Sequence, residues 1–418
     1  MKTIADFIGG SPFGDDTMPP FKEGQPSEHA LGVLYQGPWE SMADGFNEHV
    51  RRCARALALT GCPVHLRGFL PPDTSRARYC SPEIDAIAQT SINRYSVQVN
   101  QVIVTPAVAQ RMVVHRYLSA KEMQDINRYR VVSTVLERDR VSPDIVRSLQ
   151  QMAQVWVACH ANRDTLVRCG LAPERVKVVP IPYFPDDPLL ALRGRVRKPG
   201  VPRFYHIGKW EPRKAQDQII LAFMQAFKPG EAHLVLKTTL WSPPKNDSYP
   251  MNPEIAIAKA IHAGVRGWTD KNWKSSIEII SDRLTDRQLL ALHRFGDVYV
   301  TLSRGEGFDM PAFDAKLAGN VLVYTPSGGP QDFAGAGDYL VSATEMVPCH
   351  PFYSWEPDAQ YLDFDVTQAA EALRRAGQWP DLNHDPVQVS VVYTAEIAGE
   401  NMLRNLYEVV GKDRAVYG

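Results

Sequence analysis

From Ala30 onward, short runs rich in β-branched residues alternate with longer stretches in which apolar residues recur every three to four positions. The short runs predict buried strands and the longer stretches predict amphipathic helices. Alternation of strand and helix along a chain is typical of βαβ units, which build parallel sheets. The pattern therefore predicts an α/β protein built from two Rossmann-like series in tandem.

The first series occupies residues 30–185 and is expected to form the N-terminal domain. Helices are predicted over 46–61, 143–151 and 161–170, and Gly61 is suited to end the first of them. The strands are predicted over 30–36, 63–69, 130–136, 154–159 and 175–180.

Periodicity breaks over residues 183–203, which combine several prolines with a cluster of arginines. Such a break is typical of a segment between domains. We therefore place an interdomain linker at 186–202. The poorly patterned residues 1–29 are predicted to form an N-terminal arm.

The second series, residues 203–385, is expected to form the C-terminal domain. Helices are predicted over 214–227 and 285–294, and the latter opens with Thr285 and Gln288 at capping-box spacing. The strands are predicted over 203–208, 233–239, 276–281, 297–303 and 321–325.

The last segment, 386–418, is predicted to contain a crossover helix over 391–410. A long proline-rich segment at 241–254 is either a lid or an insertion. Two Rossmann-like domains are expected to face a central cleft, because ligands of this fold bind at the carboxyl ends of the strands.

Overall composition narrows the classes of function. The formal net charge is −1, from 46 basic and 47 acidic residues, which gives no sign of a polyanionic partner. The six cysteines form no C-x-x-C pair, and we expect them to be reduced in a cytoplasmic protein. No stretch has the apolar length of a transmembrane segment, and no grouping has metal-ligand spacing, so neither is predicted.

Residues 303–333 carry the most informative pattern. Glu306 stands between two glycines that allow a backbone to approach a ligand closely, at the end of a predicted strand. A helix is then expected to begin with Asp309 as its N-cap, with Asp314 one turn further on. Gly328 and Gly329 form a second small-residue turn before another predicted helix start. Two helix N-termini at one crevice would form an anion site that needs no metal.

This stretch resembles the E-x7-E motif of retaining GT-B glycosyltransferases, whose setting is S-x-x-E-G-F-G-x-P-x-x-E-A-x-A-x-G. Here seven residues separate Glu306 from Asp314. The resemblance implies that Glu306 meets the donor sugar and that Asp314 binds the ribose of a nucleotide-diphosphate sugar. The other matching positions are Gly307, Phe308, Pro311, Ala315, Ala318 and Gly319.

Two residues depart from the motif. Asp314 replaces the second glutamate, which shortens the reach to the ribose by about 1.5 Å. Asp309 replaces the glycine that follows Phe308, which adds a side chain near the donor sugar.

Residues 206–223 are similar to the G-R-x-x-x-x-K-G segment with which the same family grips the donor diphosphate. Lys209 falls on the arginine position and Lys214 on the lysine position, while Arg213 could supply the missing guanidinium. The resemblance implies that these cations stabilise the leaving diphosphate in place of a metal ion.

The acceptor side is less clearly marked. Gly45 directly precedes the first predicted helix, as in the family's glycine-containing loop near the acceptor. Many relatives place a histidine and an acid after the strand that matches 130–136. This chain offers Leu136 and Glu137 instead.

The resemblance implies a retaining, metal-independent hexosyl- or pentosyltransferase without a cofactor, using a UDP- or GDP-type donor. Its partners would be the nucleotide sugar and an unidentified hydroxyl acceptor: a glycan, a lipid-linked glycan, a small molecule, a protein or modified DNA. One alternative is a GT-B protein that binds nucleotide sugars without turnover. Another is a DNA-modifying glycosyltransferase, against which the near-zero net charge argues.

Overall fold

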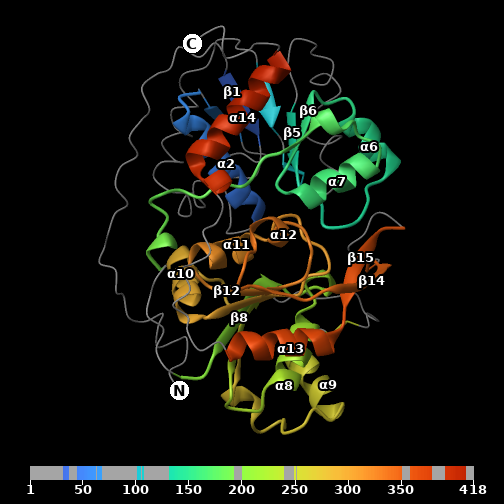
Figure 1. The fold of residues 1–418 in the computed structure, drawn as a ribbon, viewed down its shortest axis with the longest axis vertical. Coiled ribbons are helices and arrows are strands. Elements are labelled where there is room, and N and C mark those ends of the chain that lie inside the picture. The colour runs from blue at the N-terminus through green and yellow to red at the C-terminus, as the bar shows by residue number, and fades with distance from the viewer. Residues whose placement is uncertain are drawn as a thin grey trace. The chain divides into compact units, whose positions relative to one another are not determined.

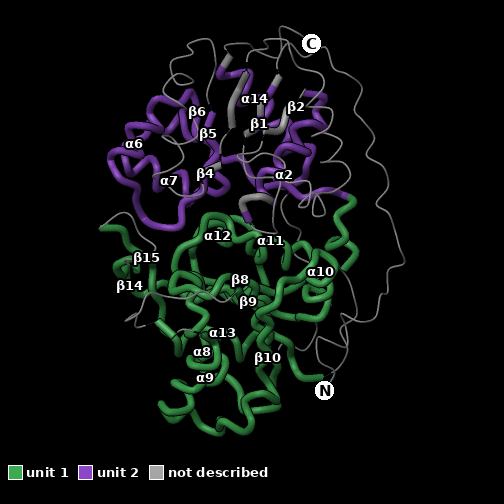
Figure 2. Tube along the Cα trace, turned by 180° about the vertical axis from the view of Figure 1, so that it is seen from behind, with its two compact units in different colours: residues 1–12, 186–389 green, residues 13–185, 390–418 purple. Residues whose placement is uncertain are grey.

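A computed structural model shows an α/β protein (Figure 1). Its described residues form two compact units, coloured separately in Figure 2. Those of unit 1 fall within Asp186–Val389, and those of unit 2 within Phe13–Pro185 together with Ser390–Gly418. The structure describes residues 32–36, 45–62, 64–67, 101–104, 106–107, 131–192, 200–239, 249–250, 252–350, 358–378 and 391–410.

Unit 1 is built on a six-stranded parallel sheet with the order β10-β9-β8-β11-β12-β13. The chain enters at β8, adds β9 and β10 on one side, and then crosses to place β11 on the other side of β8 (Figure 1). The direction of strand addition therefore reverses between β8 and β11. The strands are β8 (Arg203–Lys209), β9 (His233–Thr239), β10 (Ile277–Ile280), β11 (Val298–Thr301), β12 (Val321–Tyr324) and β13 (Tyr339–Leu340).

Helices cover both faces of this sheet, with α8, α9 and α13 on one face and α10, α11 and α12 on the other (Figure 1). The core under the first face joins Phe204 of β8 to Ile219 and Phe223 of α8. The helices are α8 (Gln216–Ala226), α9 (Pro253–His262), α10 (Asp286–Phe295), α11 (Met310–Leu317), α12 (Pro330–Phe333) and α13 (Val366–Gly377), with short 3-10 turns η4 (Pro212–Lys214) and η5 (Trp273–Ser275).

Helix boundaries in unit 1 follow from local chemistry. Thr285 and Gln288 form the predicted capping box at the start of α10. Gly319 has a φ of 76°, a left-handed conformation that suits glycine and ends α11 as expected. Helix α8 begins at Gln216 rather than at residue 214, because Ala215 itself is left-handed, with a φ of 48°.

The sequence pattern missed α9, α13 and a β-hairpin in unit 1. The hairpin pairs β14 (Ala343–Pro348) with β15 (Gln360–Phe364) in antiparallel fashion. Four of the five buried residues of α13 are alanines, which give a weak apolar signal although they pack into the core.

Unit 2 also contains parallel strands, in the orders β2-β1-β3 and β4-β5-β6-β7. Strands β3 and β4 are separated along the chain by one residue. The elements are β1 (Gly32–Gln36), β2 (Val64–Arg67), β3 (Gln101–Val104), β4 (Pro106–Ala107), β5 (Val131–Thr134), β6 (Gln154–Val157), β7 (Val176–Val178), α2 (Gly45–Leu59), α6 (Pro143–Leu149), α7 (His160–Arg168) and η2 (Pro173–Arg175). The next turn along the chain, η3 (Leu190–Leu192), already belongs to unit 1.

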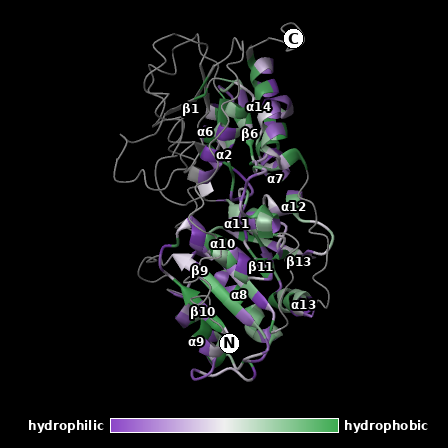
Figure 3. Ribbon diagram, turned by 90° about the vertical axis from the view of Figure 1, so that its left-hand side faces the viewer, coloured by the Kyte–Doolittle hydropathy of each residue, from purple (hydrophilic) through white to green (hydrophobic). Residues whose placement is uncertain are grey.

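The last described helix, α14 (Ala395–Val410), belongs to unit 2 and follows the short turn η6 (Val391–Tyr393). Hydrophilic and hydrophobic residues alternate along it (Figure 3). Its Met402 and Leu403 share a buried core with Cys53 of α2. The chain thus leaves unit 2, builds unit 1 and returns. None of the described helices has the length and apolar character that crossing a bilayer requires.

Candidate functional site

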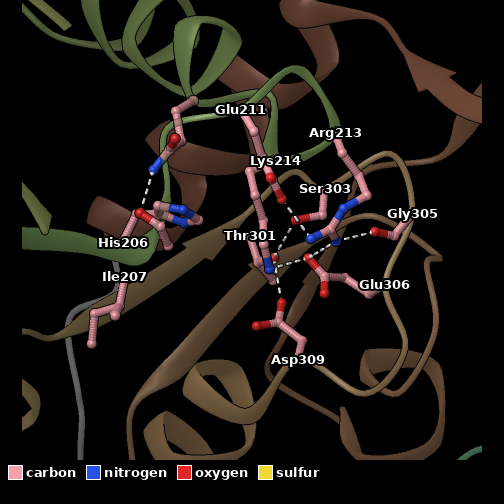
Figure 4. Close-up of polar contacts among 12 residues, drawn as sticks. His206, Ile207, Glu211, Arg213, Lys214, Thr301, Ser303, Gly305, Glu306 and Asp309 are labelled. Atoms are coloured by element: carbon pink, nitrogen blue, oxygen red, sulfur yellow. Dashed lines mark hydrogen bonds and ion pairs between the residues drawn. The ribbon is translucent and has the colours of Figure 1, made fainter. Parts of the chain in front are cut away.

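Charged residues of unit 1 gather where the strand order reverses. The loop after β8 carries Glu211, Arg213 and Lys214, and the loop after β11 carries Glu306 and Asp309 (Figure 4). Because β8 and β11 are parallel neighbours, these loops leave the same edge of the sheet in different directions. In open α/β sheets this is the place where ligands bind.

Glu306 is the centre of this cluster and is buried. Lys214 Nζ donates a hydrogen bond to Glu306 Oε1, and Arg213 Nη1 lies 3.3 Å from the same oxygen. Burial alone would raise the pKa of Glu306, but Lys214 and Arg213 outweigh it and lower the pKa to about 2. Burial is the largest single effect on Lys214 and lowers its pKa, but the charges of Glu306 and Asp309 and the hydrogen bond to Glu306 together exceed it, so the pKa rises. The two groups therefore stay charged at neutral pH.

Arg213 fixes the geometry around Glu306. Its Nη1 donates to the carbonyl of Gly305 at 2.6 Å, and its Nη2 donates to Glu211 Oε1 at 2.6 Å. Arg213 and Glu211 are both buried. The guanidinium thus joins the loop after β8 to the loop after β11.

Asp309 occupies the N-cap position of α11, but its side chain makes no capping hydrogen bond. The predicted N-cap position is therefore confirmed, although the helix is not capped by a side-chain hydrogen bond there. The backbone of Asp309 is left-handed, with a φ of 64°, and Thr301 Oγ1 donates to its Oδ2 at 2.6 Å. The carboxylate thus faces the end of β11, and the left-handed backbone at this position is one that a glycine would adopt without strain.

The second oxygen of Asp309, Oδ1, is buried without a hydrogen-bond partner among the described residues. Burial raises the pKa of Asp309 to about 6, and the neighbouring charge of Glu306 acts in the same direction. Lys214, Thr301 and the amide of Ala312 oppose this rise without cancelling it. The pKa of Asp309 therefore lies closer to neutral pH than that of Glu306.

The other predicted donor-site residues lie outside this network. Lys209 is exposed at the end of β8 and forms no ion pair within the described part of the chain. Asp314 is half-buried in α11. Phe308 is buried against the rings of Phe313 and Phe333, at centroid distances of 5.1 and 5.5 Å.

Gly328 and Gly329 pack directly on the loop that carries Glu306. A Cβ at Gly328 would lie 2.1 Å from the carbonyl oxygen of Glu306, and one at Gly329 would lie 2.2 Å from that of Phe308. Both positions therefore require glycine for close approach of two backbones. The helix that follows, α12, has only four residues. The turn thus has a structural role beside its predicted contact with the donor, and Gly307 lies in the loop that it supports.

The two acceptor-side predictions fall in unit 2. Gly45 is the exposed first residue of α2. Glu137 is half-buried in the loop after β5. Leu136 is buried, and both its amide and its carbonyl are bound by the side chain of Asn162. The Asn162 amide thus fixes the backbone beside Glu137.

Three site residues were missed in the sequence. Glu211 neutralises Arg213, Thr301 binds Asp309, and a hydrogen bond from Ser303 helps to lower the pKa of Glu306. The strand-end hydroxyls of Thr301 and Ser303 were the available signal, because strand ends line the ligand edge of such sheets.

Comparison with known proteins identifies the fold. No protein-family model and no curated protein matches the chain. A sucrose-phosphate synthase from Thermosynechococcus elongatus is similar in structure with a TM-score of 0.61 and 14% identity, over 91% of this chain and 99% of that one. The lipopolysaccharide outer core galactosyltransferase WaaB gives 0.59 and 10%, over 90% and 99%. A structure described as trehalose-6-phosphate from E. coli, bound with UDP-2-fluoro glucose, gives 0.58 and 12%, over 90% and 99%.

These similarities confirm the predicted fold class. The chain has the α/β fold of the GT-B glycosyltransferases, with parallel sheets and covering helices in both units. Within the described residues, no group of three or more histidine, cysteine or acidic side chains is placed to hold a metal ion.

Proposed function

We propose that this protein is a glycosyltransferase that moves a sugar from a nucleotide-diphosphate donor to a hydroxyl acceptor, with retention and without a metal ion. The observation that carries the proposal is the buried contact of Glu306 with Lys214 and Arg213 at the reversal of strand order. This position suits an anionic ligand, because the N-termini of α8 and α11 lie directly after the two loops.

In the proposed reaction the bond between the anomeric carbon and the diphosphate breaks, and the acceptor oxygen bonds to the same carbon from the same face. The proton of the acceptor hydroxyl passes to an oxygen of the departing diphosphate. Lys214, together with the exposed Lys209, would stabilise the negative charge that develops on the leaving diphosphate. Glu306 would hold hydroxyls of the donor sugar and favour positive character at the ring. Asp314 would bind the ribose hydroxyls.

We propose that the nucleotide of the donor is UDP or GDP. One structurally similar protein is bound with UDP-2-fluoro glucose, and another is a UDP-forming synthase, which supports testing uridine nucleotides first. The transferred group would be a hexose or a pentose, and transfer would take place in the cytoplasm. On the acceptor side, Gly45 and Glu137 of unit 2 are proposed to lie near the incoming hydroxyl.

Two measurements test this function. A thermal-shift screen with UDP, GDP and their common sugar esters should show stabilisation by one nucleotide family, because a specific ligand stabilises the folded state in proportion to its saturation. The stabilising sugar ester should then be hydrolysed slowly without acceptor, releasing the nucleoside diphosphate, and excess EDTA should not stop this release. Stabilisation without any release would instead identify a binding protein without turnover. Loss of release in EDTA that Mg²⁺ restores would contradict the metal-free mechanism.

A further inference from the structure

The proposed anion site contains more buried carboxylates than buried cations. Among the described residues, the buried Glu211, Glu306 and Asp309 lie with the buried Arg213 and the half-buried Lys214. A nucleotide diphosphate would bring further negative charge to this place. Since like charges at short range raise the free energy of the ionised forms, the site is poised to lose one negative charge when it binds such a ligand.

Asp309 is the carboxylate built to lose that charge. Its Oδ2 is held by Thr301, whereas its buried Oδ1 receives no hydrogen bond within the described part of the chain. Glu306, by contrast, accepts from Lys214 and lies close to Arg213. A carboxylate oxygen without a donor gains least from ionisation, so a proton is best accommodated at Asp309 Oδ1.

The groups around Asp309 come from three segments. Strand β11 contributes Thr301 and the buried Tyr299 phenol, and the loop after β11 contributes Glu306. The loop after β8 contributes Lys214, whose positive charge is shared between Glu306 and Asp309. His206 of β8 also interacts with Lys214 and Glu306, but burial lowers its pKa to about 4 and it is neutral near pH 7.

We propose that Asp309 is a positioning residue for Lys214 and that it takes up one proton when a nucleotide diphosphate binds. This inference rests on the proposed function. With Asp309 ionised, its charge attracts Lys214 in addition to the ion pair of Lys214 with Glu306. Once Oδ1 carries a proton from the solvent, Asp309 is neutral, Oδ2 still accepts from Thr301, and the charge of Lys214 is available to the phosphates.

The direction of proton transfer follows from the two carboxylates nearest to Lys214. The pKa of Glu306 is about 2 and that of Asp309 about 6, so added negative charge near pH 7 protonates Asp309 first. At pH 5 Asp309 is already mostly protonated in the free protein. Proton uptake should therefore be large at pH 7 and small at pH 5.

Isothermal titration calorimetry tests the proposal. UDP and GDP are titrated into the full-length protein at pH 7 and pH 5, each in two buffers of different ionisation enthalpy, and the protons taken up per bound nucleotide are obtained from the difference. The same titrations use Asp309→Asn, and Asp309→Gly as a second variant that suits the left-handed backbone and introduces no side chain. Because the nucleotide's own protonation is common to all three proteins, the difference between them isolates Asp309.

At pH 7 we expect the wild-type protein to take up at least half a proton more than either variant, and at pH 5 we expect the difference to vanish. Equal uptake by wild type and a folded variant at pH 7 would overturn the inference while leaving the proposed function in place. If neither nucleotide binds the wild-type protein, the proposed function fails and this inference fails with it.

Discussion

At the scale of single residues, the two acids of the motif have different surroundings. Glu306 is buried among cations, whereas Asp314 is half-buried in α11. If Glu306 meets the donor sugar, its contribution grows as the ring gains positive character, and Glu306→Gln should lower kcat by about a hundredfold or more. If Asp314 meets the ribose, its contact is equal in ground and transition states, and Asp314→Asn should raise KM with little change in kcat.

Steady-state kinetics with saturating acceptor separates these effects. Circular dichroism should show that both variants are folded. Asp314→Glu, which restores the usual length of the second acid, serves as the matched control and should not raise KM. A Glu306→Gln protein with near-normal kcat would remove the basis of the motif assignment.

Lys214 gives a second test, which distinguishes a ligand contact from a structural pair. Lys214→Ala should weaken binding of UDP relative to uridine by about 1.5–3 kcal/mol, the usual value of a charge-assisted contact. The variant should also be less stable, because Glu306 then keeps only Arg213 as a buried partner. Calorimetry with both ligands measures the difference, and Lys228→Ala, at an exposed position beyond α8, is the control. Equal weakening of UDP and uridine would mean that Lys214 only supports the fold.

The ionisation of Asp309 should also appear in the stability of the free protein. Its pKa is about 6 in the fold against 3.8 as the reference value, so folding favours its protonated form. This contribution is complete below about pH 3.8 and is lost as the pH rises through 6. Relative to Asp309→Asn, the wild type should therefore lose Tm between pH 4 and pH 7. Scanning calorimetry of both proteins across this pH range measures the change. A Tm difference between wild type and Asp309→Asn that does not change with pH would contradict the raised pKa of Asp309.

Sequence reasoning identified the charged residues of this cluster more accurately than it identified the contacts between them. Two separate resemblances to the family assigned Glu306, Lys214 and Arg213 to one donor site, and the structure brings them into one network. The orientation of Asp309 was not predictable, because its left-handed backbone and the hydroxyl of Thr301 decide it jointly. Predicting the pairing of Glu211 with Arg213 would have required knowing that both are buried.

At the scale of elements, strands and amphipathic helices were predictable because their apolar residues are large. Helix α13 was missed because its buried face is mostly alanine. The start of α8 was misplaced by two residues because nothing in the local pattern signals a left-handed Ala215. The burial of the alanine face and the conformation of Ala215 both depend on contacts that form only in the folded unit.

Close approach of α14 to α2 provides a test at this scale. A Cβ at Gly399 would lie 2.4 Å from the carbonyl oxygen of Ala56. Gly399→Ala improves intrinsic helix propensity by about 1 kcal/mol, but the steric clash should outweigh this gain and destabilise the protein by roughly 1–3 kcal/mol. Urea unfolding measures the net change, with exposed Arg404→Ala as the control. An unchanged or higher stability of Gly399→Ala would mean that the helices separate at little cost.

At the scale of the whole molecule, the chain path makes the two units unequal. The described core of unit 1 is built from one continuous stretch within Asp186–Val389, which also contains Lys209, Lys214, Glu306 and Asp314. Unit 2 needs residues from both sides of that stretch, because α14 completes a core with α2.

A fragment of residues 186–389 should therefore fold by itself and bind the same nucleotide as the full chain. A chain that stops at residue 389 should lose the cooperative unfolding of unit 2, because Met402 and Leu403 no longer cover α2. Circular dichroism and thermal melting of the two shortened chains, compared with the full chain, test both statements. A 1–389 chain that keeps both transitions would show that α14 contributes little to the core of unit 2.

The return of the chain to unit 2 has a consequence for synthesis on the ribosome. Residues of α2 leave the exit tunnel early, but α14 follows only after unit 1, about 340 residues later. At roughly 5–20 residues per second, the surface of α2 that α14 covers stays open to solvent for about 17–70 s. Unit 1 can finish folding before unit 2 does, although the synthesis of unit 2 begins first. We therefore expect chaperones to bind the nascent chain mainly at the exposed apolar surface of α2.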